Sequence, residues 1–284
     1  MKARYGLPFK GSKNKIATWI IDNLPSADVF CDLFCGGGAV THAALRSDKY
    51  KHFIANDIDG RLPKLFIDCC YGKYTVENHP EWISREEFFA RKDADAYIAL
   101  VWSFANNGKD YLYARDLESF KKAMHYAIFF EDKSLMDAAG IPITLCKGSI
   151  YERYLHVKHQ LEALKKHPMY CENLTRAIEI ERLQSLQSLQ SDYRQVDIPE
   201  GALIYCDIPY AGTNCGMYKG FDNNAFYEWA RAQDNIYISE YNMPDDFIVI
   251  AEREKIQLST ANGNYKRALE RIYTNRRTYE RRHT

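Results

Sequence analysis

Four consecutive residues, Asp207-Ile208-Pro209-Tyr210, carry the strongest chemical signal in this chain of 284 residues. They follow the apolar run Leu203 to Cys206, which is typical of a buried strand. An acid, a constrained turn and an aromatic ring at the end of a strand suit a planar amine held between a carboxylate and a carbonyl. In isolation the same residues are more simply a proline-containing turn, so the interpretation depends on what accompanies them.

A glycine-rich segment, Asp32-Leu33-Phe34-Cys35-Gly36-Gly37-Gly38, follows a second apolar run. Glycines between a strand and a helix let the backbone turn sharply and approach a ligand closely. The spacing is not that of dinucleotide enzymes, because no further glycine stands three residues after Gly38. At the end of the next expected strand, Asp57 could accept hydrogen bonds from ribose hydroxyls or cap a helix. Together the two segments favour an adenosine-containing ligand.

The elements that must position these residues alternate between strand and helix. In the first seventy residues we expect helix 13–24, strand 27–34, helix 39–47 and strand 52–56, which form a βαβ unit. Further strands are expected at 202–207, 235–239 and 247–252, with a helix at 221–233. The pattern predicts an α/β fold with a Rossmann-like sheet built from both ends of the chain, residues 1–70 and 177–284.

The middle of the chain, residues 71–176, differs from the ends because aromatic and charged residues dominate it. Helical spacing at 85–92, 117–130 and 151–166 predicts an inserted, mostly helical domain. The turn 106–109 of this insert contains Asn106, Asn107 and Lys109, which could reach base edges.

Two segments near the end of the chain have simpler interpretations. Leucine at every third position of 183–191 predicts a short packed helical stripe. Residues 266–282 form a basic tail, which is either a solvated surface or a set of phosphate contacts.

Composition limits the class of protein. Lysine plus arginine equals aspartate plus glutamate at 38 each, so no global field attracts a polyanion. The sequence has no uninterrupted apolar stretch of about 18 residues, which a membrane span requires. Several cysteines lie in apolar runs and none has zinc-knuckle spacing. We expect a soluble cytoplasmic protein without a metal or disulfides.

Five segments, in order along most of the chain, resemble the D12 class of DNA adenine-N6 methyltransferases, the family that includes the Dam enzymes. They are Phe9-Lys10-Gly11-Ser12-Lys13, Asp32 to Gly38, Asp57, Asp207 to Tyr210 with Gly212-Thr213 and Tyr218, and Ser239-Glu240-Tyr241-Asn242. One departure is Ile208, where the family pattern has proline. Isoleucine keeps the backbone carbonyl but loses the fixed φ angle of proline.

The resemblance implies an S-adenosylmethionine-dependent methyltransferase sheet, with residues 71–176 as the target-recognition domain. It implies that Asp207, Ile208, Pro209 and Tyr210 are catalytic, with the aromatic ring stacked on a flipped-out adenine of double-stranded DNA. The residues implied for the cofactor S-adenosyl-L-methionine are Phe9, Lys13, Asp32, Phe34, Gly36, Gly38, Asp57, Asp192 and Asp207.

The resemblance further implies a bacterial or phage-encoded enzyme, a monomer or weak dimer. It leaves open whether a restriction endonuclease is its partner. Two alternatives to DNA methylation are methylation of adenine N6 in RNA and a catalytically impaired relative that still binds DNA. Cytosine-C5 methylation is disfavoured, because its nucleophilic cysteine usually follows proline and no Pro-Cys dipeptide occurs here.

Overall fold

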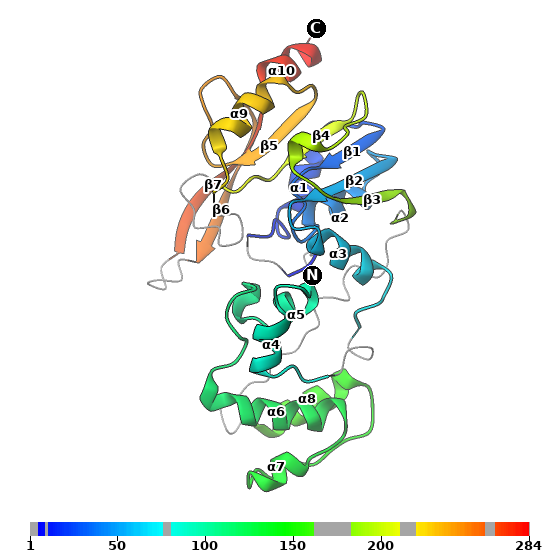
Figure 1. Cartoon of the computed structure of the whole chain (residues 1–284), viewed down its shortest axis with the longest axis vertical. Helices are drawn as coiled ribbons and strands as arrows, with labels where there is room; N and C mark the ends of the chain where they lie inside the picture. The colour runs from blue at the N-terminus through cyan, green and yellow to red at the C-terminus, as the bar shows by residue number, and fades with distance from the viewer. Residues whose placement is uncertain are drawn as a thin grey trace. The chain divides into compact units, whose positions relative to one another are not determined.

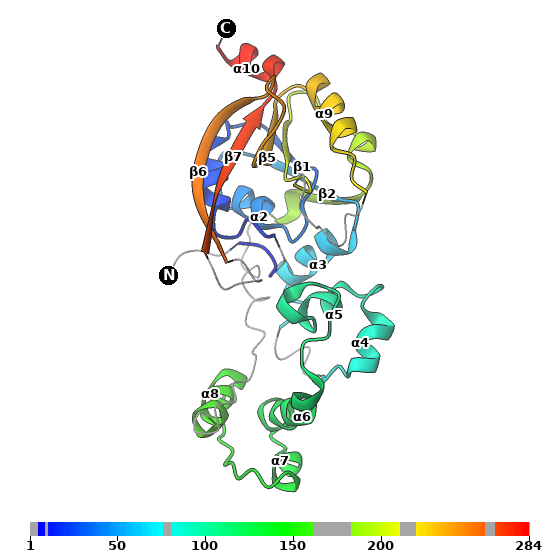
Figure 2. The ribbon, with the colours of Figure 1, turned by 90° about the vertical axis from the view of Figure 1, so that its left-hand side faces the viewer.

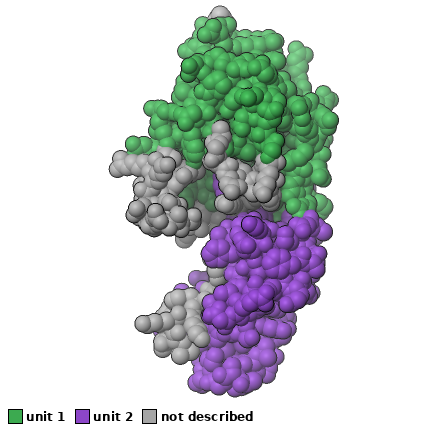
Figure 3. All heavy atoms as spheres, turned by 60° about the vertical axis from the view of Figure 1, so that its left-hand side comes forward, with its two compact units in different colours: residues 1–6, 12–66, 180–284 green, residues 7–11, 67–179 purple. Residues whose placement is uncertain are grey.

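The computed structural model describes residues 5–8, 11–75, 81–161, 183–210, 220–258 and 265–283, without the side chains of 255–258 and 265–268. The chain divides into two compact units (Figure 3). Unit 1 comprises residues 1–6, 12–66 and 180–284, and unit 2 comprises residues 7–11 and 67–179. A compact unit therefore covers the part of the chain where an inserted domain is expected.

Unit 1 is built on a mixed sheet whose strand order is β3-β2-β1-β4-β5-β7-β6 (Figure 1). The strands are β1 (Val29–Asp32), β2 (His52–Asp57), β3 (Leu186–Gln190), β4 (Leu203–Cys206), β5 (Ile236–Glu240), β6 (Ile248–Leu258) and β7 (Tyr265–Thr274). The first five are parallel to one another, and β7 is antiparallel to both β5 and β6. This arrangement confirms the predicted α/β fold with a mostly parallel sheet.

Apolar side chains cover both faces of the sheet, because successive residues of a strand point to opposite faces. On one face, Cys31 of β1 and Ile238 of β5 share a buried cluster with Phe226 of α9 (Asn223–Ala232). On the other face Phe30 packs against Tyr50, with ring centroids 4.8 Å apart. Figure 2 shows α9 beside the sheet.

The other helices of unit 1 are α1 (Ala17–Asn23), α2 (Ala39–Leu45), α3 (Arg61–Cys70, which continues into unit 2) and α10 (Arg276–His283). Two short 3-10 helices are η4 (Leu183–Ser185) and η5 (Tyr193–Gln195).

Unit 2 is helical in its described residues, as the helical spacing of its sequence predicts. Its elements are α4 (Arg85–Arg91), α5 (Ala96–Val101), η1 (Phe104–Asn106), α6 (Arg115–Phe129), α7 (Ser134–Ala138) and α8 (Ile150–Leu161). Helix α4 begins with a capping box, in which Ser84 and Glu87 each accept a hydrogen bond from the other's backbone N–H. Met124 of α6 and Val157 of α8 lie in one buried cluster, so this unit has a core of its own.

One prediction about secondary structure is wrong, and one further segment forms elements that local spacing does not indicate. The leucine repeat forms η4 and then β3, because residues 186–190 pair in parallel with β2 at the edge of the sheet. Within the basic segment, residues 265–274 form β7 between β5 and β6, and residues 276–283 form α10. Strands β3 and β7 pair with β2 and β5, which are distant in the sequence, and local spacing does not reveal such pairing.

Candidate active site at the carboxyl ends of the strands

The carboxyl ends of the parallel strands lie at one edge of the sheet, and acidic residues stand there. The register pairs Asp32 of β1 with Ala55 of β2 and with Tyr205 of β4. Asp57 ends β2, and Asp207 directly follows β4. Two residues after β3, Asp192 lies at the same edge, because β3 ends opposite Asp57. Ligands of open α/β sheets bind at this edge, so the structure brings these predicted site residues to one place.

The glycine turn between β1 and α2 is fixed by the buried side chain of Asp57. The amide of Gly36 donates to Asp57 Oδ2 at 2.8 Å, and the amide of Asp59 donates to Oδ1 at 2.9 Å. Gly38 has a φ of +72°, and a Cβ there would lie 2.8 Å from Cγ of Phe66. The turn therefore needs glycine at position 38 for its conformation and for the space around it.

Gly6, in the N-terminal segment, packs against this turn, and sequence reasoning missed it. A Cβ on Gly6 would lie 2.5 Å from the amide nitrogen of Ala39 and from the carbonyl oxygen of Gly37, so the N-terminal segment lies directly against the turn. The amide of Gly6 donates to Nδ1 of His42 at 3.0 Å. Burial lowers the pKa of His42 to about 4, which keeps its ring neutral and able to accept.

Asp32, the first residue of the glycine-rich segment, is an almost fully buried carboxyl group. Thr41 Oγ1 donates to its Oδ2 at 2.7 Å, whereas Oδ1 has no hydrogen-bond partner within the described part of the chain. Burial raises the pKa of Asp32 to about 7, and the charges of Asp207 and Asp57 add to the effect against the Thr41 hydrogen bond. A nearby cation would therefore stabilise the ionised form of this group.

Asp207 forms a partly buried ion pair with Lys13, a residue 194 positions away. Lys13 Nζ donates to Asp207 Oδ1 at 2.6 Å, and the Lys13 side chain is 5% exposed. Burial lowers the pKa of Lys13, but the charges of Asp207 and then of Glu270 outweigh it, so this pKa lies above its ordinary value. Lys13 is therefore a cation in contact with the predicted catalytic acid.

The ring of Tyr210 is held from several sides. Lys13 Nζ lies 4.6 Å from its centroid, and Tyr241 meets it edge-on with centroids 4.5 Å apart. Its hydroxyl donates to Oε1 of Glu270, a fully buried residue of β7 that sequence reasoning missed. Burial, then the charges of Asp207 and Glu270, raise the pKa of Tyr210 well above its ordinary value, so the hydroxyl keeps its proton.

The remaining residues of the catalytic motif differ in their surroundings. Ile208 is 2% exposed and packs in the core cluster with Phe226, so its side chain anchors the turn. Pro209 is partly buried, and its carbonyl accepts from Asn223 Nδ2 at 3.4 Å. The neighbouring predicted motif begins at Ser239, whose Oγ is hydrogen-bonded to Tyr205 OH at 2.8 Å.

Asp192 and Phe34, two further predicted cofactor contacts, also have partners inside the protein. The carboxylate of Asp192 receives two hydrogen bonds from the Arg194 guanidinium, at 2.8 and 2.7 Å, which hold the pKa of Asp192 below its ordinary value. Phe34 packs on Tyr193, with centroids 5.3 Å apart, and on Phe226. Phe9 and the segment with Gly212, Thr213 and Tyr218 lie outside the described residues.

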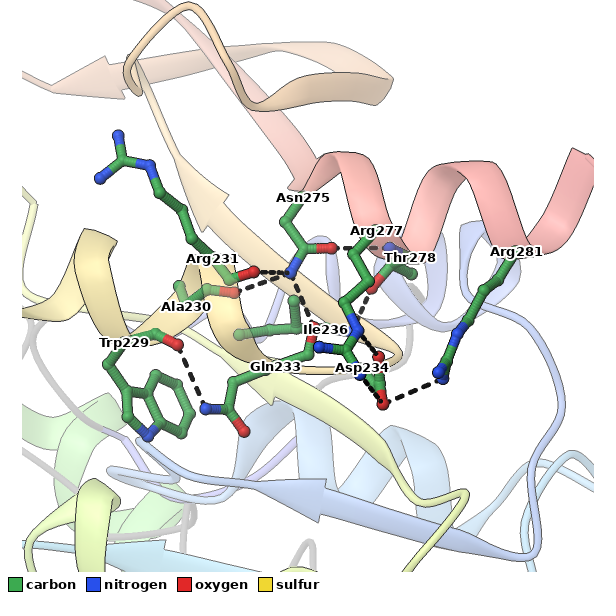
Figure 4. Close-up of polar contacts among 10 residues, drawn as sticks. All are labelled: Trp229, Ala230, Arg231, Gln233, Asp234, Ile236, Asn275, Arg277, Thr278 and Arg281. Carbon is green, nitrogen blue, oxygen red and sulfur yellow. Dashed lines mark hydrogen bonds and ion pairs between the residues drawn. The ribbon is translucent and has the colours of Figure 1, made fainter.

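The arginines of α10 lie far from this site along the strands. Figure 4 shows Asn275 donating to the carbonyls of Ala230 and Gln233, at 2.7 and 2.8 Å, while its Oδ1 accepts from the amide of Thr278. Thr278 Oγ1 in turn accepts from the amide of Ile236, the first residue of β5. Helix α10 is thus fixed at the amino end of β5, which is the opposite edge from Asp207.

Two of these arginines also have an acidic partner, because Arg277 and Arg281 both pair with Asp234 (Figure 4). In α9, Arg231 pairs with Asp246. Their position and these ion pairs favour a structural role over contacts with the phosphates of a substrate bound at the other edge.

In the insert, two of the predicted base contacts stabilise their own turn. Asn106 Nδ2 donates to the carbonyl of Leu100 at 2.8 Å, and Asn107 Oδ1 accepts from the amides of Lys109 and Asp110. Lys109 is exposed. The structure thus shows a turn-forming role for both asparagines.

An α/β sheet with a glycine turn after its first strand and acids at its strand ends defines a class of enzymes that bind adenosine-containing cofactors. Within that class, the family model of the D12 class N6 adenine-specific DNA methyltransferase matches residues 9–241. The chain therefore belongs to this family, and it is an S-adenosylmethionine-dependent, adenine-specific DNA methyltransferase. A comparison with curated proteins found no match. None of the described helices has the length and apolar character to cross a membrane.

The residues at the sheet edge fit the expected cofactor. Asp32 Oδ1, buried and without a hydrogen-bond partner in the described part of the chain, could accept from the ammonium of a methionine moiety. Asp57 stands at the end of β2, where ribose hydroxyls are bound in nucleotide-binding sheets. Gly36 and Gly38 leave the turn without side chains at these two positions.

Proposed function

We propose that Asp207, the backbone carbonyl of Ile208 and the ring of Tyr210 form the methyl-transfer site for an adenine turned out of duplex DNA. The observation that carries this proposal is the Lys13–Asp207 ion pair beside the Tyr210 ring, directly after the fourth parallel strand. A base must leave the helix to reach such a site, since its amine is otherwise inside the stack.

The chemistry that these groups provide follows from the electronic structure of adenine. The lone pair of N6 is delocalised into the ring, so the amine is a poor nucleophile. Asp207 and the carbonyl of Ile208 would each accept a hydrogen bond from one N6–H, which favours tetrahedral nitrogen and returns the lone pair to it. When bound, S-adenosylmethionine supplies the methyl group from a sulfonium. As the N6–methyl bond forms, the bond from the methyl carbon to sulfur would break with a neutral thioether as the leaving group, and one N6 proton would then be lost to Asp207 or to water. The protein's contribution is then to position both partners and to supply fixed acceptors.

Lys13 orients the acid in this scheme. Its ammonium binds one oxygen, Oδ1, of Asp207 and lies over the Tyr210 ring. A single cation thereby links the acceptor for the amine to the ring on which the base would stack. The role of Ile208 rests on its backbone, and its buried side chain anchors the turn without the proline ring.

The test is transfer from labelled S-adenosylmethionine to unmethylated duplex DNA, followed by nucleoside mass spectrometry. We expect N6-methyladenine from the wild type and none from Asp207→Ala. The matched control is Asp28→Ala, which removes an exposed acid paired with Lys51 at the other end of β1. Equal product from Asp207→Ala, or methylcytosine as the product, would refute the proposal. An equal mass of RNA in competition separates DNA from RNA substrates.

We also propose that residues 71–176 choose the DNA sequence. Support comes from a separate compact unit with its own core and from exposed Lys109 on a turn. The target sequence is found first by mapping N6-methyladenine in methylated genomic DNA. Lys109→Ala should then raise the KM for DNA or relax sequence choice while the Kd for S-adenosylmethionine is unchanged. An unchanged KM and an unchanged site would count against this turn.

Base flipping is tested separately, with 2-aminopurine at the target adenine. Its fluorescence should rise on binding, and no rise with an active enzyme would exclude extrusion of this base. A restriction endonuclease partner, a monomeric or weakly dimeric state and a cytoplasmic bacterial or phage setting stay predictions from the family resemblance.

A further inference from the structure

Glu270 is a buried carboxylate whose side chain contacts two residues of the proposed transfer site. Its side chain is 0% exposed, and the residue lies in β7, one position before Arg271, which pairs with Glu240 at the carboxyl end of β5. It stands outside residues 9–241, the part of the chain that the family model matches. The long C-terminal hairpin thus brings an acid to the edge of the sheet where Asp207 lies.

The contacts of Glu270 are specific. Its Oε1 accepts the hydrogen bond of the Tyr210 hydroxyl and lies 3.7 Å from Lys13 Nζ, which also binds Asp207. Burying a carboxylate costs free energy unless cations and donors compensate it, and an apolar residue at this buried position of β7 would satisfy the packing at lower cost. The position of this acid is therefore better explained by its contacts with Tyr210 and Lys13 than by the stability of the sheet.

The hydrogen bond to Glu270 restricts the aromatic ring. A tyrosine ring turns about two side-chain bonds, and fixing its hydroxyl removes most of that freedom. Lys13 over one face and the edge of Tyr241 limit the ring further. Isoleucine at position 208 leaves the backbone of this turn without the constraint of a proline ring, so side-chain contacts carry more of the positioning.

We propose that Glu270 is a positioning residue for methyl transfer, which fixes the Tyr210 ring and shares Lys13 with Asp207. This inference rests on the proposed function of Asp207 and Tyr210. Because it acts through the ring and the ion pair, Glu270 should affect the turnover rate more than the binding of either substrate.

The experiment measures kcat, the KM for DNA and the Kd for S-adenosylmethionine in Glu270→Gln, Glu270→Leu, Tyr210→Phe and the double variant Glu270→Leu/Tyr210→Phe. Glu270→Gln keeps the shape and an acceptor oxygen, so it guards against misfolding. Glu252→Gln is the matched control, because Glu252 lies on the adjacent strand β6 and is 59% exposed. Circular dichroism and thermal unfolding establish that each variant is folded.

We expect Glu270→Leu and Tyr210→Phe each to lower kcat about 10- to 100-fold, which is the size of a lost hydrogen bond to a charged group. Glu270→Gln should lie between Glu270→Leu and the wild type, and Glu252→Gln should match the wild type. The KM for DNA and the Kd for S-adenosylmethionine should each change less than about threefold. The double variant should be no slower than the slower single variant, since both changes remove one interaction.

Two results would overturn the inference. The first is full kcat in Glu270→Leu, and the second is a double variant whose losses multiply, which indicates independent roles. Failure of the proposed function has a different signature, in which the wild type makes no N6-methyladenine or Asp207→Ala stays active. A wild type that depends on Asp207 but not on Glu270 would refute this inference alone.

Discussion

Replacing Lys13 by methionine removes the only cation that the described residues place between Asp207 and Glu270. Methionine has a similar length, so the change mainly leaves two carboxylates close together without their shared partner. Removing one member of a buried ion pair costs about 3–5 kcal/mol. Asp207 is 21% exposed, so water compensates part of the loss, and about 2–3 kcal/mol is the expected destabilisation at pH 8.

The loss should depend on pH in a defined direction. Without Lys13, the carboxylates of Asp207 and Glu270 repel each other in the folded protein, whereas they lie far apart in the unfolded chain. This repulsion exists only while both groups carry a charge, so a fall in pH relieves it and a rise in pH strengthens it. The destabilisation should consequently be smaller at pH 5 than at pH 8.

Thermal unfolding of the wild type and the variant at both pH values measures the effect. A change of 2–3 kcal/mol corresponds to a fall in Tm of roughly 4–12 °C for a protein of this size. Lys51→Met, at an exposed lysine paired with Asp28, is the matched control and should leave Tm unchanged. A Lys13 variant that loses no more than this control at pH 8, or loses equally at pH 5 and pH 8, would refute the reasoning.

Three further predictions concern stability. Burial raises the pKa of Asp32 from 3.8 to about 7, so ionising this group as the pH rises from 4 to 7 should cost the folded protein up to about 4 kcal/mol. Asp32→Asn avoids this cost. In the absence of cofactor, the Tm of this variant relative to the wild type should therefore rise over that pH range. Gly38→Ala should lower the free energy of unfolding by about 2 kcal/mol, because position 38 has a positive φ and lies close to the ring of Phe66. Adding Phe66→Leu to this variant should recover part of the lost Tm. Asn275→Ala removes hydrogen bonds to buried carbonyls and should lower the free energy of unfolding, measured with denaturant, by about 2–3 kcal/mol. The kcat at low temperature should be retained. A loss of kcat without a loss of stability would instead link α10 to substrate.

Local signals in the sequence predicted much of the fold. Helix α2 begins at Ala39 and β2 at His52, as the apolar runs and the glycine turn indicate. Such elements are readable because their burial pattern repeats within a few residues. The prediction of a helical stripe for the leucine repeat was wrong, because this segment forms a strand by pairing with β2, more than 120 residues earlier in the chain.

The candidate site was also predicted only in part. Asp32, Asp57 and Asp207 were expected at strand ends, and the parallel register places them at one edge of the sheet. Glu270 was missed because its sequence neighbours form a basic, exposed-looking segment without a motif. Only its place in β7, beside the end of β5, gives it a role.

The sequence by itself determined the turns, the apolar strands and the order of the chemical groups, because these depend on residues close together in the chain. The tertiary structure decided which groups meet: Lys13 reaches Asp207 across 194 positions, and Glu270 reaches Tyr210 across 60. Contacts of this kind depend on how strands align in the sheet, and their free energy is gained only when the whole sheet is formed.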